Sequence, residues 1–146
     1  MHKFESQIFI NRPPQEVFEF VTDPANSMKY QSGVKSAEWT SNGAVGVGST
    51  FKVVNRFMGR DIDAELQITD WQPPTQNTFK TISGPVPFEV TVKTEPQGEG
   101  TLMTQTGQVE FSGVFKLAEG MTGKQLDKQM KADNQTLKDL LESNSK

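Results

Sequence analysis

The residue types that most often perform covalent or metal chemistry are scarce in this sequence. It contains no cysteine, which excludes disulfide bonds, thiolate metal ligands and cysteine nucleophiles. The single histidine is His2, near the N-terminus, so a histidine-based triad and a cluster of histidine metal ligands are excluded too. Serine or threonine could in principle pair with lysine, but no spacing indicates such a pair. Any reaction would therefore depend on one or two other polar groups.

Three acidic residues resemble a metal-binding cluster: Asp61, Asp63 and Glu65. Residues two apart on a strand share a face but stand about 6.6 Å apart. The ligands of one divalent cation must all place oxygens ~2.0–2.6 Å from the ion, and three side chains along a straight strand converge poorly. We therefore expect a solvated sheet face here, with no metal and no other cofactor.

The glycine-rich residues 43–48 (GAVGVG) resemble a phosphate-binding loop only superficially. A dinucleotide-binding fingerprint follows a strand and opens a helix, whereas this segment opens a strand. We expect a flexible hairpin loop. Tyr30, Arg56 and Arg60 could each contact the polar end of a ligand, although single residues of this kind more often lie on the surface.

Three polar residues interrupt otherwise apolar patterns: Asn55, Gln105 and Asp133. A buried carboxylate has a raised pKa and can hold or donate a proton, which makes Asp133 the candidate catalytic residue. Alternatively, Asp133 lies near the edge of its helix, solvated or paired with a lysine, because a lone aspartate is almost never fully buried. Asn55 would face solvent if the register of its strand differed by one residue.

Alternating apolar and polar residues predict seven strands. The most regular alternation places Ile62, Ala64, Leu66 and Ile68 on one packed face. Short turns separate successive segments, which favours an antiparallel meander. The expected strands cover residues 4–10, 34–40, 50–58, 61–68, 77–82, 86–94 and 101–111.

Two short helices and one long helix are expected beside the sheet. Pro14 and Pro24 suit first helical positions, and Asp23 can cap the second helix, which predicts helices over residues 14–22 and 24–30. Thr122 and Gln125 have capping-box spacing, and apolar residues follow at helical intervals, which predicts a long helix over residues 122–142. Residues 112–121 are ambiguous. The segregation of strands and helices indicates the α+β class.

Composition places the chain among single-domain globular proteins. Its 146 residues form one domain spanning 1–146, with 34% apolar residues and more phenylalanine (10) than leucine. The formal net charge of −3 argues against a nucleic-acid-binding role, which would need a basic surface. Neither a signal peptide nor a membrane-spanning segment is evident, so a cytoplasmic protein is expected.

The order of these segments resembles the START/Bet v 1-like (SRPBCC) superfamily, nearest to its bacterial polyketide cyclase/dehydrase group. The resemblance covers the whole chain and rests on several short motifs in a specific order. They are Pro14-x-Glu16-Val17-Phe18, Asp23-Pro24, the Gly46-Val47-Gly48-Ser49 segment, the Ile68–Trp71 step, and the Gly100–Thr104 strand ahead of the long helix.

The resemblance implies a helix-grip fold, in which a seven-stranded antiparallel sheet curls around the C-terminal helix. It also implies a cavity between helix and sheet that holds an apolar or amphipathic small molecule. Because polar residues interrupt the apolar faces and must be satisfied, we expect a cavity of at least ~300 Å³, with its mouth near Tyr30 and the glycine loop. The candidate ligand-binding residues are Tyr30, Phe51, Val53, Asn55, Phe57, Ala64, Leu66, Phe88, Val90, Met103, Gln105, Leu126, Met130, Asp133 and Leu137. Taken singly, each of them is more readily explained as an ordinary core residue, because apolar residues mostly belong to the core.

Three functions remain open. The first, which we favour, is the binding of a hydrophobic lipid, polyketide or aromatic compound. The second is a cyclase/dehydrase-type enzyme that acts by positioning its substrate. The third is a protein-interaction module. A small hydrophobic ligand is the expected partner, and the chain is expected to be a monomer or weak homodimer.

Overall fold

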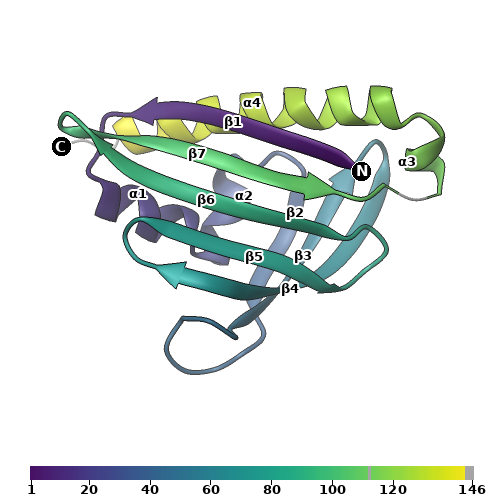
Figure 1. Ribbon diagram of the computed structural model, residues 1–146, viewed down its shortest axis with the longest axis horizontal. Helices are drawn as coiled ribbons and strands as arrows, with labels where there is room; N and C mark the ends of the chain where they lie inside the picture. Colours follow the sequence, from purple (N-terminus) through teal and green to yellow (C-terminus); the bar gives the residue numbers. More distant parts are fainter. Residues whose placement is uncertain (112, 144–146) are drawn as a thin grey trace.

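One seven-stranded sheet dominates the computed structural model, which describes residues 1–111 and 113–143. All six neighbouring strand pairs are antiparallel, in the order β1-β7-β6-β5-β4-β3-β2. This confirms the predicted helix-grip architecture (Figure 1). The strands are β1 (His2–Ile10), β2 (Val34–Trp39), β3 (Thr50–Phe57), β4 (Arg60–Gln72), β5 (Gln76–Ser83), β6 (Phe88–Gln97) and β7 (Gly100–Val109).

The meander extends from β2 to β7, while β1 joins the sheet beside β7. His2 pairs with Val109 and Ile10 with Thr101, so the first and last strands of the chain lie together. Strands β1 and β2 consequently form the two edges of the sheet, and the helical segment between them must cross from one edge to the other. That crossing closes one end of the curled sheet (Figure 1).

Strand β4 shows why one face of the sheet is packed. Ala64, Leu66 and Ile68 are buried, whereas Asp61 and Asp63 are exposed, as the alternation predicted. The register shifts between β4 and β5 at two places, and between β2 and β3 at one. Irregularities of this kind bend a strand and increase its twist, which lets a wide sheet curl.

The short helices begin where the prolines predicted. Helix α1 (Pro14–Val21) buries Val17 and Phe18, and a short 3₁₀ segment, η1 (Pro24–Asn26), leads directly into α2 (Ser27–Tyr30). The Asp23 carboxylate caps η1 by accepting a hydrogen bond of 3.0 Å from the Ala25 amide. Proline has no amide hydrogen to leave unsatisfied, so it fits these first positions.

The long helix begins earlier than the capping-box pattern predicted. A short helix α3 (Val114–Leu117) precedes α4 (Glu119–Ser143), and residue 112 lies outside the described part of the chain. The Thr122 amide donates a 2.8 Å hydrogen bond to the Ala118 carbonyl, so Thr122 lies inside the first turn instead of capping it. The predicted cap is therefore wrong, although the start differs by only three residues.

Helix α4 lies beside β1 and runs in the same direction (Figure 1). His2 contacts Asp127 at 2.8 Å, and Asn134 Nδ2 donates to Ser6 Oγ at 2.5 Å. Among the strands, β1 makes the most extensive contacts with α4. The helix therefore packs closely against one edge of the sheet and leaves room over its middle.

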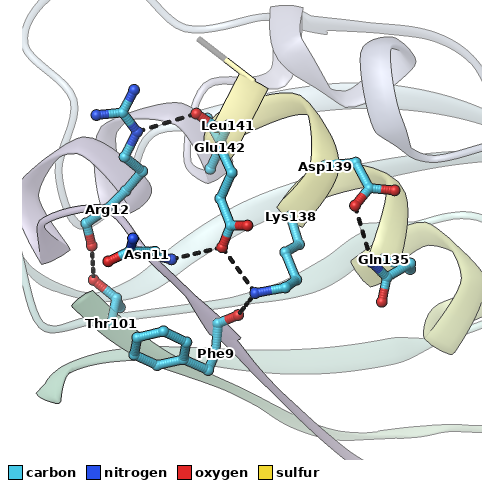
Figure 2. Close-up of polar contacts among 9 residues, drawn as sticks. All are labelled: Phe9, Asn11, Arg12, Thr101, Gln135, Lys138, Asp139, Leu141 and Glu142. Atoms are coloured by element: carbon cyan, nitrogen blue, oxygen red, sulfur yellow. Dashed lines mark hydrogen bonds and ion pairs between the residues drawn. The ribbon is translucent and has the colours of Figure 1, made fainter. Parts of the chain in front are cut away.

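Polar contacts fix the C-terminal end of α4 to the end of β1, as Figure 2 shows. Glu142 accepts hydrogen bonds of 2.8 Å from the Asn11 amide and from Lys138, and Lys138 also donates to the Phe9 carbonyl at 2.8 Å. Arg12 Nε donates to the Leu141 carbonyl at 3.1 Å. The last carbonyls of a helix lack partners within the helix, so Arg12 satisfies one of them and holds the helix in place.

Candidate functional site

A cavity of about 250 Å³ lies between the inner face of the sheet and α4. Strands β1 to β7, the segment from α1 to α2, and the middle of α4 all contribute to its wall. The volume is below the ~300 Å³ that we expected. Part of the space between α4 and the sheet is taken by a hydrophobic cluster in which Leu137 and Leu141 of the helix pack against Ile10 and Met103 of the sheet.

All but two of the sequence-predicted site residues line this cavity. Those that line it are Tyr30, Phe51, Val53, Asn55, Phe57, Ala64, Leu66, Phe88, Val90, Gln105, Leu126, Met130 and Asp133. The two others, Met103 and Leu137, have no exposed surface and belong to a solid hydrophobic cluster with Ile10 and Leu141. Their predicted place at the cavity is wrong, because α4 packs directly on the sheet there.

The glycine loop does not line the cavity, contrary to the predicted mouth. Its Val45 instead borders a second hollow, more open to solvent, together with Phe18 and Trp71. Arg56 and Arg60 are exposed and lie outside the lining as well. Arg56 forms an ion pair of 3.0 Å with Asp61, so its guanidinium already has a partner on the outer surface.

Aromatic side chains make up much of the apolar wall. The rings of Phe51 and Phe79 meet edge to face, with centroids 5.6 Å apart. Tyr30 is only 5% exposed and its ring packs against Phe20, with centroids 6.0 Å apart. Ring edges and faces of this kind favour flat, unsaturated partners by offset or edge-to-face contact.

Amide side chains provide most of the polar lining. The carbonyl oxygens of Asn55 and Asn77 are buried without any hydrogen-bond partner. Gln105 and Gln129 also line the cavity. Buried polar groups are nearly always satisfied, so two unpaired oxygens in one wall indicate that a bound molecule or water completes them.

Sequence reasoning missed Asn77 and Asn134, although both had a signal. Asn77 lies two residues before the inward-facing Phe79, hence on the same face of β5. Asn134 follows Met130 by four residues and precedes Leu137 by three, which is true helical spacing. Asn134 is therefore buried at 5% exposure, while the neighbouring Asp133 is only half-buried.

Asp133 lies at the cavity edge and is held by the loop that follows α2. Its Oδ1 accepts hydrogen bonds from the Ser32 amide at 3.1 Å and the Ser32 hydroxyl at 3.0 Å. Burial raises the pKa of the Asp133 carboxyl, and the bonds from Ser32 partly oppose that rise. Burial, with a smaller contribution from the Asp133 charge, also raises the pKa of the Tyr30 hydroxyl, which therefore stays protonated.

The pKa of Asp133 predicts how stability depends on pH. Because the folded-state pKa of Asp133 is raised, the protonated carboxyl favours the folded state. This stabilisation is fully present below the usual aspartate pKa of about 3.9, and it is lost as pH rises through the folded-state pKa. Asp133→Asn keeps an oxygen for Ser32 and removes the buried charge. We expect the variant to be at least as stable as the parent at pH 7, and to lose that advantage as pH falls toward 4. Urea denaturation at both pH values measures this; a variant destabilised more at pH 7 than at pH 4 would contradict it.

Charge is nearly absent from the cavity wall. Among the described lining residues there is no lysine, arginine or histidine, and Asp133 is the one acidic group. Within the described residues, no group of three or more acidic, histidine or cysteine side chains converges in a way that could hold a metal ion. In the same residues, no helix combines the length and apolarity needed to cross a bilayer.

Solved structures share this fold over nearly their whole length. A Thermus thermophilus protein, TTHA0849, superposes with a TM-score of 0.85 at 21% identity, covering 99% of each chain. A START superfamily protein from Mycobacterium smegmatis gives a TM-score of 0.81 at 14% identity, covering 98% of this chain and 99% of its own. The Aha1 dimer from Colwellia psychrerythraea gives 0.66 at 20% identity, covering 100% of both chains. A search of curated proteins gave no match.

A family model supplies the identification. The model described as "Polyketide cyclase / dehydrase and lipid transport" matches residues 1–142, almost the entire chain. The match agrees with the sheet, the long helix and the cavity between them. The protein therefore belongs to the polyketide cyclase/dehydrase and lipid transport family.

Proposed function

We propose that this protein binds a hydrophobic or amphipathic small molecule, such as a lipid, polyketide or aromatic compound, in the cavity beneath α4. The observation that carries the proposal is a mainly apolar cavity of about 250 Å³ with unpaired amide oxygens in its wall. Small-molecule sites are mainly apolar and contain a few placed polar groups. The family description, which includes lipid transport, supports the same function.

An enzymatic role is the second candidate, and Asp133 is the observation that favours it. Its carboxyl lies at the cavity wall, near Tyr30, with a raised pKa. A carboxyl of that kind can exchange a proton with a positioned substrate. Asp133→Asn would then abolish turnover of a polyketide substrate while ligand binding is retained. Unchanged turnover would remove Asp133 from the mechanism.

Filling the cavity tests the binding function. The neutral fluorophore N-phenyl-1-naphthylamine should bind the native protein with a rise in fluorescence. Ala64→Trp and Met130→Trp add a large side chain to the wall from the sheet and from the helix, and each should weaken binding at least tenfold. Ile82→Trp is the matched control, because Ile82 lies on β5 with 48% of its surface exposed and outside the lining.

Two measurements make this result decisive. Circular dichroism and urea denaturation must show that each tryptophan variant is folded, and the second variant serves if the first does not fold. Equal probe affinity in the parent and in both folded cavity variants would place binding elsewhere. Absence of probe binding to the parent would leave the protein-interaction role. The expectation of a monomer or weak homodimer is tested separately by sedimentation.

A further inference from the structure

The charge of the cavity wall restricts what can bind there. Among the described lining residues, none carries a positive charge, and the half-buried Asp133 contributes a negative one. Moving a carboxylate or phosphate out of water is costly unless a cation or several donors receive it. A fatty acid or phospholipid headgroup would enter this cavity without a counter-charge and would also be repelled by Asp133.

Two amide oxygens in the cavity wall have no hydrogen-bond donor. Asn77 is 4% exposed, and its carbonyl oxygen has no partner; the carbonyl oxygen of Asn55 is likewise buried and unpartnered. Leaving a buried acceptor unpaired is unfavourable, and a hydrogen-bond donor on the ligand would remove that cost. The wall therefore favours a ligand that carries hydroxyl or amide hydrogens.

Beside Gly33, the amide nitrogen of Gln129, a hydrogen-bond donor, lies near the unpaired carbonyl oxygen of Asn55. A methyl group built on Gly33 would lie 2.6 Å from Asn55 Oδ1 and 2.5 Å from Gln129 Nε2, so these two amide groups occupy the space that a side chain at position 33 would need. Both amides also line the cavity. A hydroxyl group both donates and accepts, so one hydroxyl could satisfy both amides.

We infer that the ligand of this cavity is a neutral, hydroxyl-bearing aromatic compound and not an anionic lipid. This inference rests on the proposed binding function. The aromatic wall favours flat rings, and the amides favour hydroxyl groups. An apolar cavity of about 150 Å³ is enough for benzene. The present volume of about 250 Å³ therefore suits a compound of about two fused rings.

A matched pair of probes tests the charge preference. 2-Naphthol and 2-naphthoate have the same ring system, but at pH 7 the first is neutral and the second is an anion. Each is titrated as a competitor of N-phenyl-1-naphthylamine. We expect 2-naphthol to bind at least about 100-fold more tightly, because the carboxylate finds no cation in the wall.

Substitution of the amides tests the hydrogen bonds. In Asn55→Leu and Asn77→Leu, the affinity for 2-naphthol relative to 2-methoxynaphthalene, which has no hydrogen to donate, should fall by about two- to tenfold. Asn42→Leu is the control. Asn42 is an exposed asparagine directly before the glycine loop and outside the lining, so the ratio should not change.

The outcomes separate this inference from the function on which it rests. If the fluorophore binds but naphthoate competes as well as naphthol, the inference is overturned and the binding function stands. An unchanged ratio in both asparagine variants would overturn the hydroxyl contact in the same way. If no probe binds the parent protein, both the binding function and the inference fail.

Discussion

Replacing Phe18 with alanine should lower the free energy of unfolding by about 3–5 kcal/mol. Phe18 is 2% exposed, and its ring packs on Trp71 with centroids 5.1 Å apart. The substitution removes both the buried apolar surface and this aromatic contact, and leaves a void between α1 and β4. The loss is a large share of the ~5–15 kcal/mol that stabilises a typical domain.

Urea denaturation, followed by tryptophan fluorescence and by circular dichroism, measures this effect. Met28→Ala is the control, because Met28 lies on the adjacent α2 with 49% of its surface exposed and should change stability by less than about 0.5 kcal/mol. A denaturation midpoint that Phe18→Ala leaves unchanged would show that α1 does not depend on this contact.

Leu137→Ala should cost about 2–5 kcal/mol, and clearly more than Met130→Ala, at about 1 kcal/mol. Both residues lie on the inward stripe of α4, but their surroundings differ. Leu137 has no exposed surface and packs in the solid cluster, so its removal creates a new void. Met130 is only partly buried and already borders the open cavity, so its removal enlarges a space that exists.

The comparison of these two variants tests where the cavity ends along the helix. Leu117→Ala is the control. Because 88% of the Leu117 surface is exposed, its loss of unfolding free energy gives the value for a leucine that is hardly packed. Equal losses for Leu137→Ala and Met130→Ala would mean that the protein packs both positions alike. The cavity would then not end between them.

Local patterns predicted the elements because local physics decides them. Proline occupies the first turn of α1 and of η1, as predicted. The alternation in residues 61–68 correctly predicted which face of β4 is buried. The capping-box pattern predicted the wrong start, because the helix begins about one turn earlier, at Glu119. A cap is a local preference of about 1 kcal/mol, which tertiary packing can exceed.

The candidate site was predicted as a face of the sheet and of the helix, but not as a closed volume. Periodicity says which side a residue points to, and for most of the cavity wall that was sufficient. It could not say that α4 packs against β1 at Leu137 and stands away from the sheet at Met130. It also favoured Asp133, whereas the buried polar residue of the stripe is Asn134.

The order of residues is enough to predict the α+β class, the faces of the strands and the inward stripe of the long helix, and it contains no cysteine that could act as a nucleophile or metal ligand. The size of the cavity, its boundary at Met103 and Leu137, and the separation of the glycine loop from it follow only from how the segments pack together. The difference lies in the range of the interactions along the chain. Hydrophobic pattern and proline chemistry act over a few residues, whereas a cavity is the space left between segments more than a hundred residues apart, set by how closely α4 can approach β1.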